Sequence, residues 1–246
     1  GEMTTRERLI PIAGTANSRD LGGYRADGGS TKWRALFRSD GLHRVTEEGR
    51  RGLAELGVAR VIDLRDAQEL QLSPDAALGD TLLVHQPIFA SAHEHVAAEI
   101  GIRELTEIIY LKHGDTLAAT IDLLADDTPG ATLFHCTAGK DRTGAVAALT
   151  LTAVGVDRDD VLHDYALTEQ NLAGPWLERH LDLLHSSGVA LTPKILELVG
   201  ESPVSALERA FAEVEGRFGT VRDYLLANGL SEGALERLHA RVVEAD

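Results

Sequence analysis

Cysteine is almost absent from this sequence of 246 residues, which contains only Cys136. A single thiol excludes an intramolecular disulfide and a cysteine-rich zinc site. A lone cysteine in a soluble chain is usually a small, buried apolar residue, so Cys136 taken by itself indicates packing. Its neighbours in the sequence therefore decide whether it has a chemical function.

Long hydrophobic runs are also missing. No apolar stretch approaches the ~20 residues that cross a bilayer, and residues 1–8 mix both charge signs without an apolar core of signal-peptide length. We therefore expect a cytoplasmic protein without stable membrane insertion, and the sequence leaves export without a signal peptide open. Hydrophobic residues still make up 43% of the 26.5 kDa chain, which is enough for a buried core.

Basic residues are scarce as well. Lys and Arg total 24 against 39 Asp and Glu, which gives a net charge of −15. Because nucleic-acid binding needs clustered cations that face the phosphates, this balance argues against nucleic acid as the main partner. A local basic cluster in such an acidic chain is correspondingly informative.

Short apolar strands alternate with helical segments over the first two thirds of the sequence. The expected strands are 33–38, 58–64, 81–88 and 131–135, and the expected helices are 46–56, 96–112, 115–124 and 144–154. From residue 157 onward the pattern is helical, with breaks near residues 174, 188, 193, 203, 219 and 229. This alternation predicts an α/β fold with a mainly parallel central sheet flanked by helices. Because no linker divides the chain, we expect one domain over 1–246, with the helices of about 157–246 as a cap or buttress.

The segment 134–144, FHCTAGKDRTG, lies between an expected buried strand and an apolar helix. Ligands of open α/β sheets bind at the carboxyl ends of strands, and helix N-termini attract anions. No proline follows Cys136 there, so each backbone N–H can donate to an anion, and Gly139 permits the positive φ of a wrapped loop. Arg142 can hold two oxygens of a phosphoryl group at once. The segment therefore predicts an anion site.

Cys136 is expected at the end of the strand, where the loop donors and the helix dipole would stabilise a thiolate. Surroundings of this kind lower cysteine pKa values in general from ~8.5 to ~3.5–7.5. A thiolate is the nucleophilic form of cysteine. Cys136 is thus a candidate nucleophile placed against a bound phosphate.

The pattern His-Cys-x5-Arg-Thr-Gly is the signature of cysteine-dependent phosphatases. The sequence is also similar, over nearly its whole length and least between about 91 and 115, to a bacterial family of atypical cysteine-dependent tyrosine phosphatases. The matching segments besides the signature are 17–23 (NSRDLGG), 36–39 (LFRS), 62–65 (IDLR), 154–158 (VGVDR) and 224–231 (YLLANGLS). The resemblance implies a cysteine-phosphatase fold and activity on phosphotyrosine, with phosphoserine, phosphothreonine or phosphoinositides as substrates of some members. It calls for no cofactor and no metal, and it leaves the oligomeric state unknown.

On this basis we hypothesise that Cys136 attacks phosphorus in line and forms a cysteinyl-phosphate. The equatorial oxygens would be held by the substrate phosphate-binding residues Thr137, Ala138, Gly139, Lys140, Asp141 and Arg142. The leaving group needs a proton. Asp141 is the expected general acid, because residues 86–93 contain no aspartate. The alternative is that Asp141 only braces Arg142 or Arg65.

Four further residues are expected to support this loop. His135 would orient it through backbone contacts. Thr143 would donate a hydrogen bond either to the sulfur of Cys136 or to the local backbone. Asp63 and Arg65 end a predicted strand beside the loop, where support is expected more than substrate contact.

Lys140 is open to two interpretations. A second cation at the mouth of the site suits a polyanionic substrate such as a phosphoinositide, whereas a solvated lysine would only raise the local potential. His93 and His95 flank Glu94 but lack further ligands at matching spacing, so we expect them to be solvated.

The main alternative from another class is a non-catalytic phosphate-binding module. Such a module would be expected to have lost the nucleophile or the arginine, and Cys136 and Arg142 are both present. Arsenate reduction generally needs resolving thiols, and this chain has none. A phosphorylated protein or phosphoinositide is therefore the expected partner.

Overall fold

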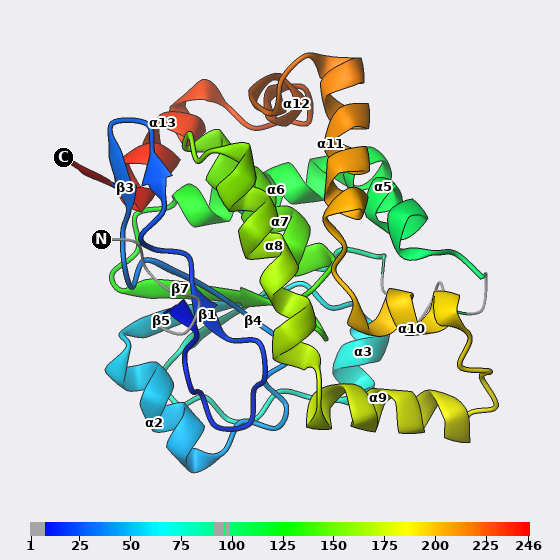
Figure 1. The fold of residues 1–246 in the computed structure, drawn as a ribbon. Coiled ribbons are helices and arrows are strands. Elements are labelled where there is room, and N and C mark those ends of the chain that lie inside the picture. Colours follow the sequence, from blue (N-terminus) through cyan, green and yellow to red (C-terminus); the bar gives the residue numbers. More distant parts are fainter. Residues whose placement is uncertain (1–7, 91–95, 97–98) are drawn as a thin grey trace.

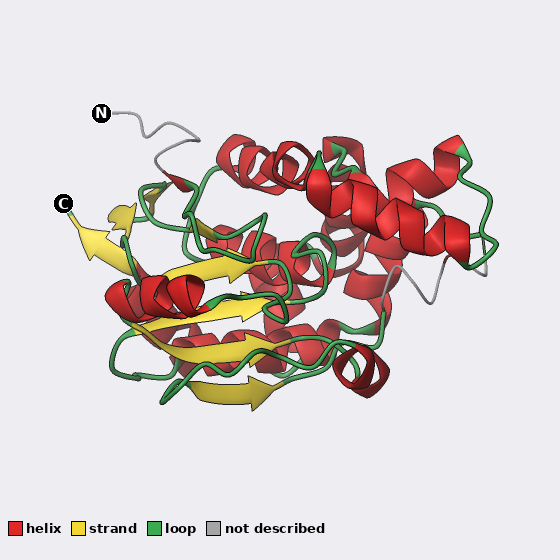
Figure 2. Ribbon diagram, turned by 90° about the horizontal axis from the view of Figure 1, so that it is seen from below, coloured by secondary structure: helices red, strands yellow, loops and turns green. Residues whose placement is uncertain are grey.

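The computed structural model describes residues 8–90, 96 and 99–246. Its centre is a five-stranded sheet with the order β1–β4–β7–β5–β6 (Figures 1 and 2). The strands are β1 (Arg19–Asp20), β4 (Leu36–Ser39), β7 (Ala131–His135), β5 (Val58–Asp63) and β6 (Leu82–His85). The four strands from β4 to β6 are parallel, and β1 pairs antiparallel with β4 at the edge. The predicted α/β fold with a mainly parallel sheet is confirmed.

Helices cover both faces of this sheet, because successive side chains of a strand point to opposite faces. Leu133 of β7 packs in a core with Leu53 of α2 (Glu47–Glu55), whereas Phe134 packs in a larger core on the other side. The larger core includes side chains of α5 (Ile102–Lys112), α6 (Gly114–Ala125) and α7 (Arg142–Ala153). Figure 1 shows α2 below the sheet and α5 to α7 above it.

Six further helices among the described residues extend the larger core: α8 (Arg158–Leu172), α9 (Pro175–Ser186), α10 (Pro193–Gly200), α11 (Val204–Phe218), α12 (Val221–Ala227) and α13 (Glu232–Val242). The short helix α3 (Ala67–Leu72), which follows β5, has no buried residue. The predicted glycine and proline breaks fall between or at the ends of the helices from α8 onward. Phe211 of α11 is fully buried in the same core as Phe134. No helix among the described residues is long and apolar enough to span a membrane.

The predicted elements differ from the structure mainly at their ends. Thr46 caps α2 by accepting from the backbone N–H of Gly49, and Gly57 follows the helix with a φ of +75°, both as expected. The predicted strand 33–38 begins only at Leu36, because Arg34 has a φ of +58° and turns the chain. The helix expected over 96–112 begins at Ile102, and residues 91–95 and 97–98 lie outside the described part.

A second, three-stranded sheet was not predicted. It consists of β2 (Arg25–Ala26), β3 (Gly29–Thr31) and β8 (Val243–Ala245), all antiparallel. Strands of two or three residues are too short to show an alternating pattern in the sequence. Their pairing joins the C-terminus to a hairpin near the start of the chain.

Candidate active site

The loop of residues 136–142, called the cysteine loop below, connects the carboxyl end of β7 to the first turn of α7. The strand before it is buried at all five positions, and Cys136 itself is 2% exposed. The arrowheads of the parallel strands in Figure 2 point to this edge of the sheet. The loop thus lies at the place where the sequence predicted an anion site.

The carbonyl groups of the cysteine loop are hydrogen-bonded to the surrounding protein. His135 Nδ1 donates to the Cys136 carbonyl and the Gly41 N–H donates to the Thr137 carbonyl, both at 2.9 Å. Asn17 Nδ2 donates to the carbonyls of Ala138 and Gly139, each at 3.1 Å. The contact of His135 is the backbone contact that was predicted for it. The loop is therefore held from outside through its acceptors.

The backbone donors of the same loop are not engaged in this way. No N–H of residues 137–141 donates a hydrogen bond to any residue that the structure describes. Gly139 has a φ of +66°, and a Cβ there would lie 2.4 Å from the carbonyl oxygen of Ser39. Glycine is required at this position both by conformation and by close packing. A loop whose carbonyl groups bond to the surrounding protein, and whose N–H groups are left without acceptors, has the arrangement of an anion nest.

A buried polar network supports the loop from below. Arg38 donates to the Gly139 carbonyl at 2.7 Å and to Asp164 of α8 at 2.9 Å. Arg19 donates to the Asp164 carbonyl at 2.7 Å and also to the side chain of Asn17. Burial alone raises the pKa of Asp164, but the charges of Arg19 and Arg38 outweigh it and lower the pKa. Asp164 therefore stays ionised and fixes two arginines beneath the loop.

Glu69 holds Arg142 in place. Its carboxylate accepts from both terminal nitrogens of Arg142, at 2.6 and 2.7 Å, and from Thr137 Oγ1 at 2.6 Å. It also accepts from the backbone N–H of Asp66, as the second half of the capping box that begins α3. Burial alone raises the pKa of Glu69, but the hydrogen bonds from Arg142 and Thr137 prevail and lower the pKa to about 2.

This low pKa predicts an acid-dependent contribution of Glu69 to stability. Because the pKa falls from 4.5 to about 2 on folding, the contribution is complete above pH 4.5 and is lost as the pH approaches 2. We expect the stability difference between wild type and Glu69→Gln to shrink by about 2 kcal/mol between pH 6 and pH 3. Urea unfolding at both pH values measures it. Glu55→Gln, at an exposed site on α2, is the control, and identical slopes for both variants would contradict the prediction.

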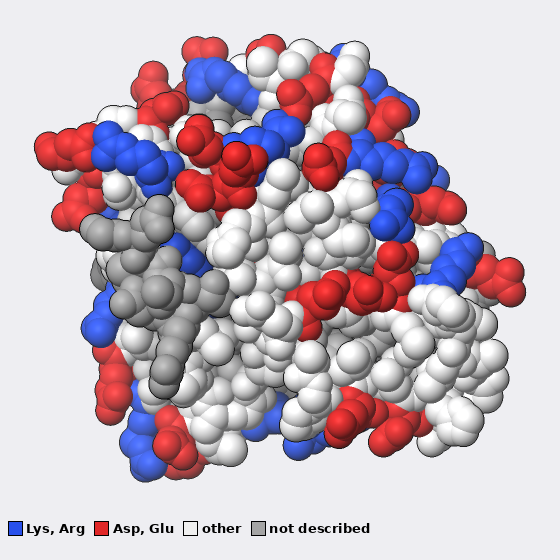
Figure 3. Space-filling view, viewed as in Figure 1, with Lys and Arg blue, Asp and Glu red and all other residues white. Residues whose placement is uncertain are grey.

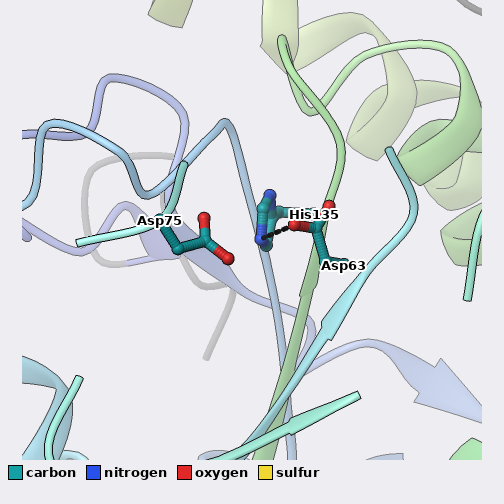
Figure 4. Close-up of side chains that lie close together, drawn as sticks. All are labelled: Asp63, Asp75 and His135. Carbon is teal, nitrogen blue, oxygen red and sulfur yellow. Dashed lines mark ion pairs between the residues drawn. The ribbon is translucent and has the colours of Figure 1, made fainter. Parts of the chain in front are cut away.

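Two carboxylates lie close to His135: Figure 4 shows its ring between Asp63 and Asp75. Arg65 NH2 donates to Asp63 and to Asp75, both at 2.9 Å, and His135 Nε2 lies 3.7 Å from Asp63 Oδ2. Burial alone raises the pKa of Asp63, but the charges of His135 and Arg65 lower it overall. Arg65 thereby supplies the counter-charge to both carboxylates. Among the described residues, the side chains of Asp63 and Arg65 make no hydrogen bond to the cysteine loop, and Asp63 approaches it through His135.

Lys140 and Asp141 form an ion pair within the loop. Lys140 Nζ lies 2.9 Å from Asp141 Oδ1, and their side chains are 1% and 8% exposed. The interpretation of Lys140 as a solvated lysine is therefore wrong, because its neighbour neutralises the charge and allows burial. Among the described residues Asp141 forms its ion pair with Lys140 and none with Arg142 or Arg65, although its charge is one of those that raise the pKa of Arg142.

Thr143 differs from both of its predicted contacts. Its hydroxyl is buried and has no hydrogen-bond partner among the described residues, whether the sulfur of Cys136 or a backbone carbonyl. It lies in the first turn of α7, where the helix fixes its position. A buried hydroxyl without a partner costs ~1–3 kcal/mol, and an acceptor that enters the loop would relieve this cost.

A cavity of about 280 Å³ opens above the cysteine loop. Its floor includes Cys136 and Arg142, and its walls include Val96, Trp176 and Leu184. The ring of His180 stacks on Trp176 of α9 with 3.6 Å between centroids. The site thus combines a polar floor with largely apolar walls. His93 and His95 lie outside the described residues.

Sequence reasoning missed the residues that come to the loop from other elements. They are Glu69 of α3, Trp176 and His180 of α9, and Asn17, Arg38 and Asp164 beneath the loop. Glu69 carries a local signal, since Asp66-x-x-Glu69 is a capping-box pattern that indicates a helix start directly after β5. Asn17 and Arg38 lie in the matching segments 17–23 and 36–39, which gave no role for either residue. Asp164, Trp176 and His180 are brought to the site by tertiary packing alone.

Comparison with known proteins gives consistent matches. A family model described as "Tyrosine phosphatase family" matches residues 10–244. A tyrosine-protein phosphatase of Nostoc commune is 30% identical over 220 residues, which cover 86% of this chain and 75% of the relative. The triple specificity protein phosphatase PtpB of Mycobacterium tuberculosis is 27% identical over 248 residues, which cover 82% of this chain and 88% of the relative.

Proposed function

The chain belongs to the tyrosine phosphatase family, and from this premise we propose that it hydrolyses phosphotyrosine in proteins through a cysteinyl-phosphate on Cys136. One observation carries the proposal. The cysteine loop turns its carbonyls outward into hydrogen bonds and leaves the N–H groups of residues 137–141 without acceptors among the described residues. Such a loop is matched to the three equatorial oxygens of a phosphoryl group.

In the first step the thiolate of Cys136 attacks phosphorus as the ester P–O bond breaks. The loop amides and Arg142 stabilise the charge on the equatorial oxygens. Glu69 accepts hydrogen bonds from both terminal nitrogens of Arg142 and so fixes the plane of its guanidinium. The Nε–H of Arg142 has no partner among the described residues. The departing oxygen takes a proton from Asp141 and leaves as the phenol of tyrosine.

In the second step water attacks the phosphorus of the cysteinyl-phosphate. Asp141 accepts a proton from this water, the S–P bond breaks, and inorganic phosphate and the thiolate of Cys136 are released. The hydroxyl of Thr143 is buried without a partner in the first turn of α7, and we propose that it turns to donate a hydrogen bond to the departing sulfur in this step. Both steps together consume one water and return the enzyme to its starting state.

The walls of the cavity favour phosphotyrosine. Trp176, Leu184 and Val96 are apolar surfaces that suit an aromatic ring. Phosphoserine and phosphothreonine lack a ring to fill this space, so we expect them to be poorer substrates. Lys140 is hydrogen-bonded to Asp141, so its charge is already paired before a substrate arrives.

The proposal is tested by pre-steady-state turnover of p-nitrophenyl phosphate. We expect a burst of nitrophenol close to one equivalent when hydrolysis of the intermediate is slower than its formation, inhibition by vanadate, and a phosphate adduct on the only cysteine after acid quench. Binding of phosphate without turnover would instead assign the chain to the non-catalytic phosphate-binding modules.

A further inference from the structure

A second cavity of about 260 Å³ lies beside the catalytic one. Arg44 and Arg179 line it, together with the backbone turn of residues 14–16 and the start of α9. Trp176 lines both cavities and so forms part of the wall between them. The second cavity is therefore a neighbour of the catalytic one, on the other side of Trp176.

Arg44 and Arg179 belong, with Arg34 and Arg51, to the few described arginines whose side chains lack partners. Neither Arg44 nor Arg179 forms an ion pair or a side-chain hydrogen bond with any described residue. This contrasts with the many arginines that pair with carboxylates elsewhere, such as Arg158 with Glu215 and Arg209 with Glu107. Asp and Glu side chains are spread over the face shown in Figure 3. Two unneutralised cations in one cavity are thus a local exception in a chain of net charge −15.

Both positive charges act on the wall between the cavities. His180, which stacks on Trp176 and lines the catalytic cavity, has a lowered pKa. Burial is the main cause, and the charges of Arg179 and Arg44 add to it. A neutral His180 leaves the arginines as the cations that an extended anionic ligand would meet beyond Trp176.

We propose that Arg44 and Arg179 form a second anion subsite, which binds an acidic side chain that flanks the phosphotyrosine of a peptide substrate. The proposal rests on the proposed function and deepens it. The guanidinium fork matches a carboxylate or a second phosphate. The wall that such a substrate crosses is the indole of Trp176, which suits a peptide better than the polyhydroxylated ring of an inositol lipid.

The test compares two phosphotyrosine peptides that differ only in flanking Glu or Gln. We expect wild type to favour the acidic peptide in kcat/KM by about tenfold, as for a charge-assisted hydrogen bond. The Arg44→Gln/Arg179→Gln variant should reduce this ratio to about one. Because the readout is the ratio of kcat/KM for the two peptides, a loss of activity that affects both peptides equally does not change it. Arg222→Gln/Arg237→Gln removes two exposed arginines on α12 and α13 and should keep the full preference.

Binding of the same labelled peptides to Cys136→Ser separates this subsite from the chemistry. We expect Cys136→Ser to bind the acidic peptide more tightly than the neutral one, and this preference should disappear when Arg44→Gln and Arg179→Gln are added. That result would support the subsite even if the wild-type protein did not hydrolyse the peptides. Equal affinities, or a preference that survives loss of both arginines, would overturn it. A short-chain phosphoinositide bisphosphate forms a third arm. If only its binding depends on the arginines, the occupant is a lipid headgroup and the peptide proposal is wrong.

Discussion

Replacing Cys136 by serine is expected to reduce turnover of p-nitrophenyl phosphate by at least about 10⁴-fold, as loss of a covalent nucleophile does elsewhere. The physical reason is that a serine hydroxyl remains protonated where a thiolate would be stabilised by the loop. Cys136 is 2% exposed and lies among side chains of the larger core. Serine is similar in size, so the loop should keep its shape.

The same variant should still bind the anion. The carbonyl contacts that shape the loop come from His135, Asn17, Gly41 and Arg38, and none of them involves the sulfur. We expect tungstate or phosphate to raise the melting temperature of Cys136→Ser and of wild type by similar amounts. Arg142→Ala is the matched control, because it removes the charged donor and should abolish this stabilisation. Turnover that survives in Cys136→Ser would rule out the covalent mechanism.

The contiguous part of the site could be predicted from the sequence because the chemistry of a loop depends on local spacing. Cys136 and Arg142 lie six residues apart on one turn of chain, with Gly139 between them where the backbone approaches Ser39. A strand before the loop and an apolar helix after it fix where this turn lies in an α/β fold. These features require no knowledge of how distant segments pack.

The rest of the site depends on contacts between distant segments. Glu69 meets Arg142 only because β5 and β7 are neighbours, which brings the start of α3 to the end of β7. Asp164 reaches Arg38 only because α8 crosses back over α7 and the sheet (Figure 1). Glu69 and Asp164 are charged residues, and charged residues are expected from the sequence to be exposed to solvent. Their burial is possible because each pairs with arginine, and pairing across the fold is not encoded in local periodicity.

Lys140 shows the same limit at short range. A lysine in a glycine-containing loop suggests exposure, yet the ion pair with Asp141 allows it to be buried at 1% exposure. The pairing also changes the view of Asp141. Within the described residues, Glu69 and Asp141 are the carboxyl groups that line the catalytic cavity. Glu69, with a pKa of about 2, remains ionised and cannot donate a proton near neutral pH.

Asp141→Asn should therefore lower kcat for substrates with a poor leaving group by ~10²–10⁴-fold, the usual range for loss of a general acid. The arriving phosphate makes this role possible despite the ion pair, because its oxygens compete for Lys140 and its negative charge favours the protonated form of a neighbouring carboxyl. Phenyl phosphate and 2,4-dinitrophenyl phosphate provide the comparison. The second leaves as a stable anion, so its cleavage by the variant should be nearly normal in a single turnover.

The control is Lys140→Gln, which breaks the same ion pair and keeps the carboxyl group. If Asp141 only served to hold Lys140, both variants would lose activity alike, and each would lose it equally on the two substrates. If Asp141 is the proton donor, only Asp141→Asn makes the single-turnover rate depend steeply on the leaving group, because the departing oxygen must then carry its full negative charge. An equal loss on phenyl phosphate and on 2,4-dinitrophenyl phosphate would assign the proton to another group. The slope of rate against leaving-group pKa thus separates the chemistry of Asp141 from its contact with Lys140.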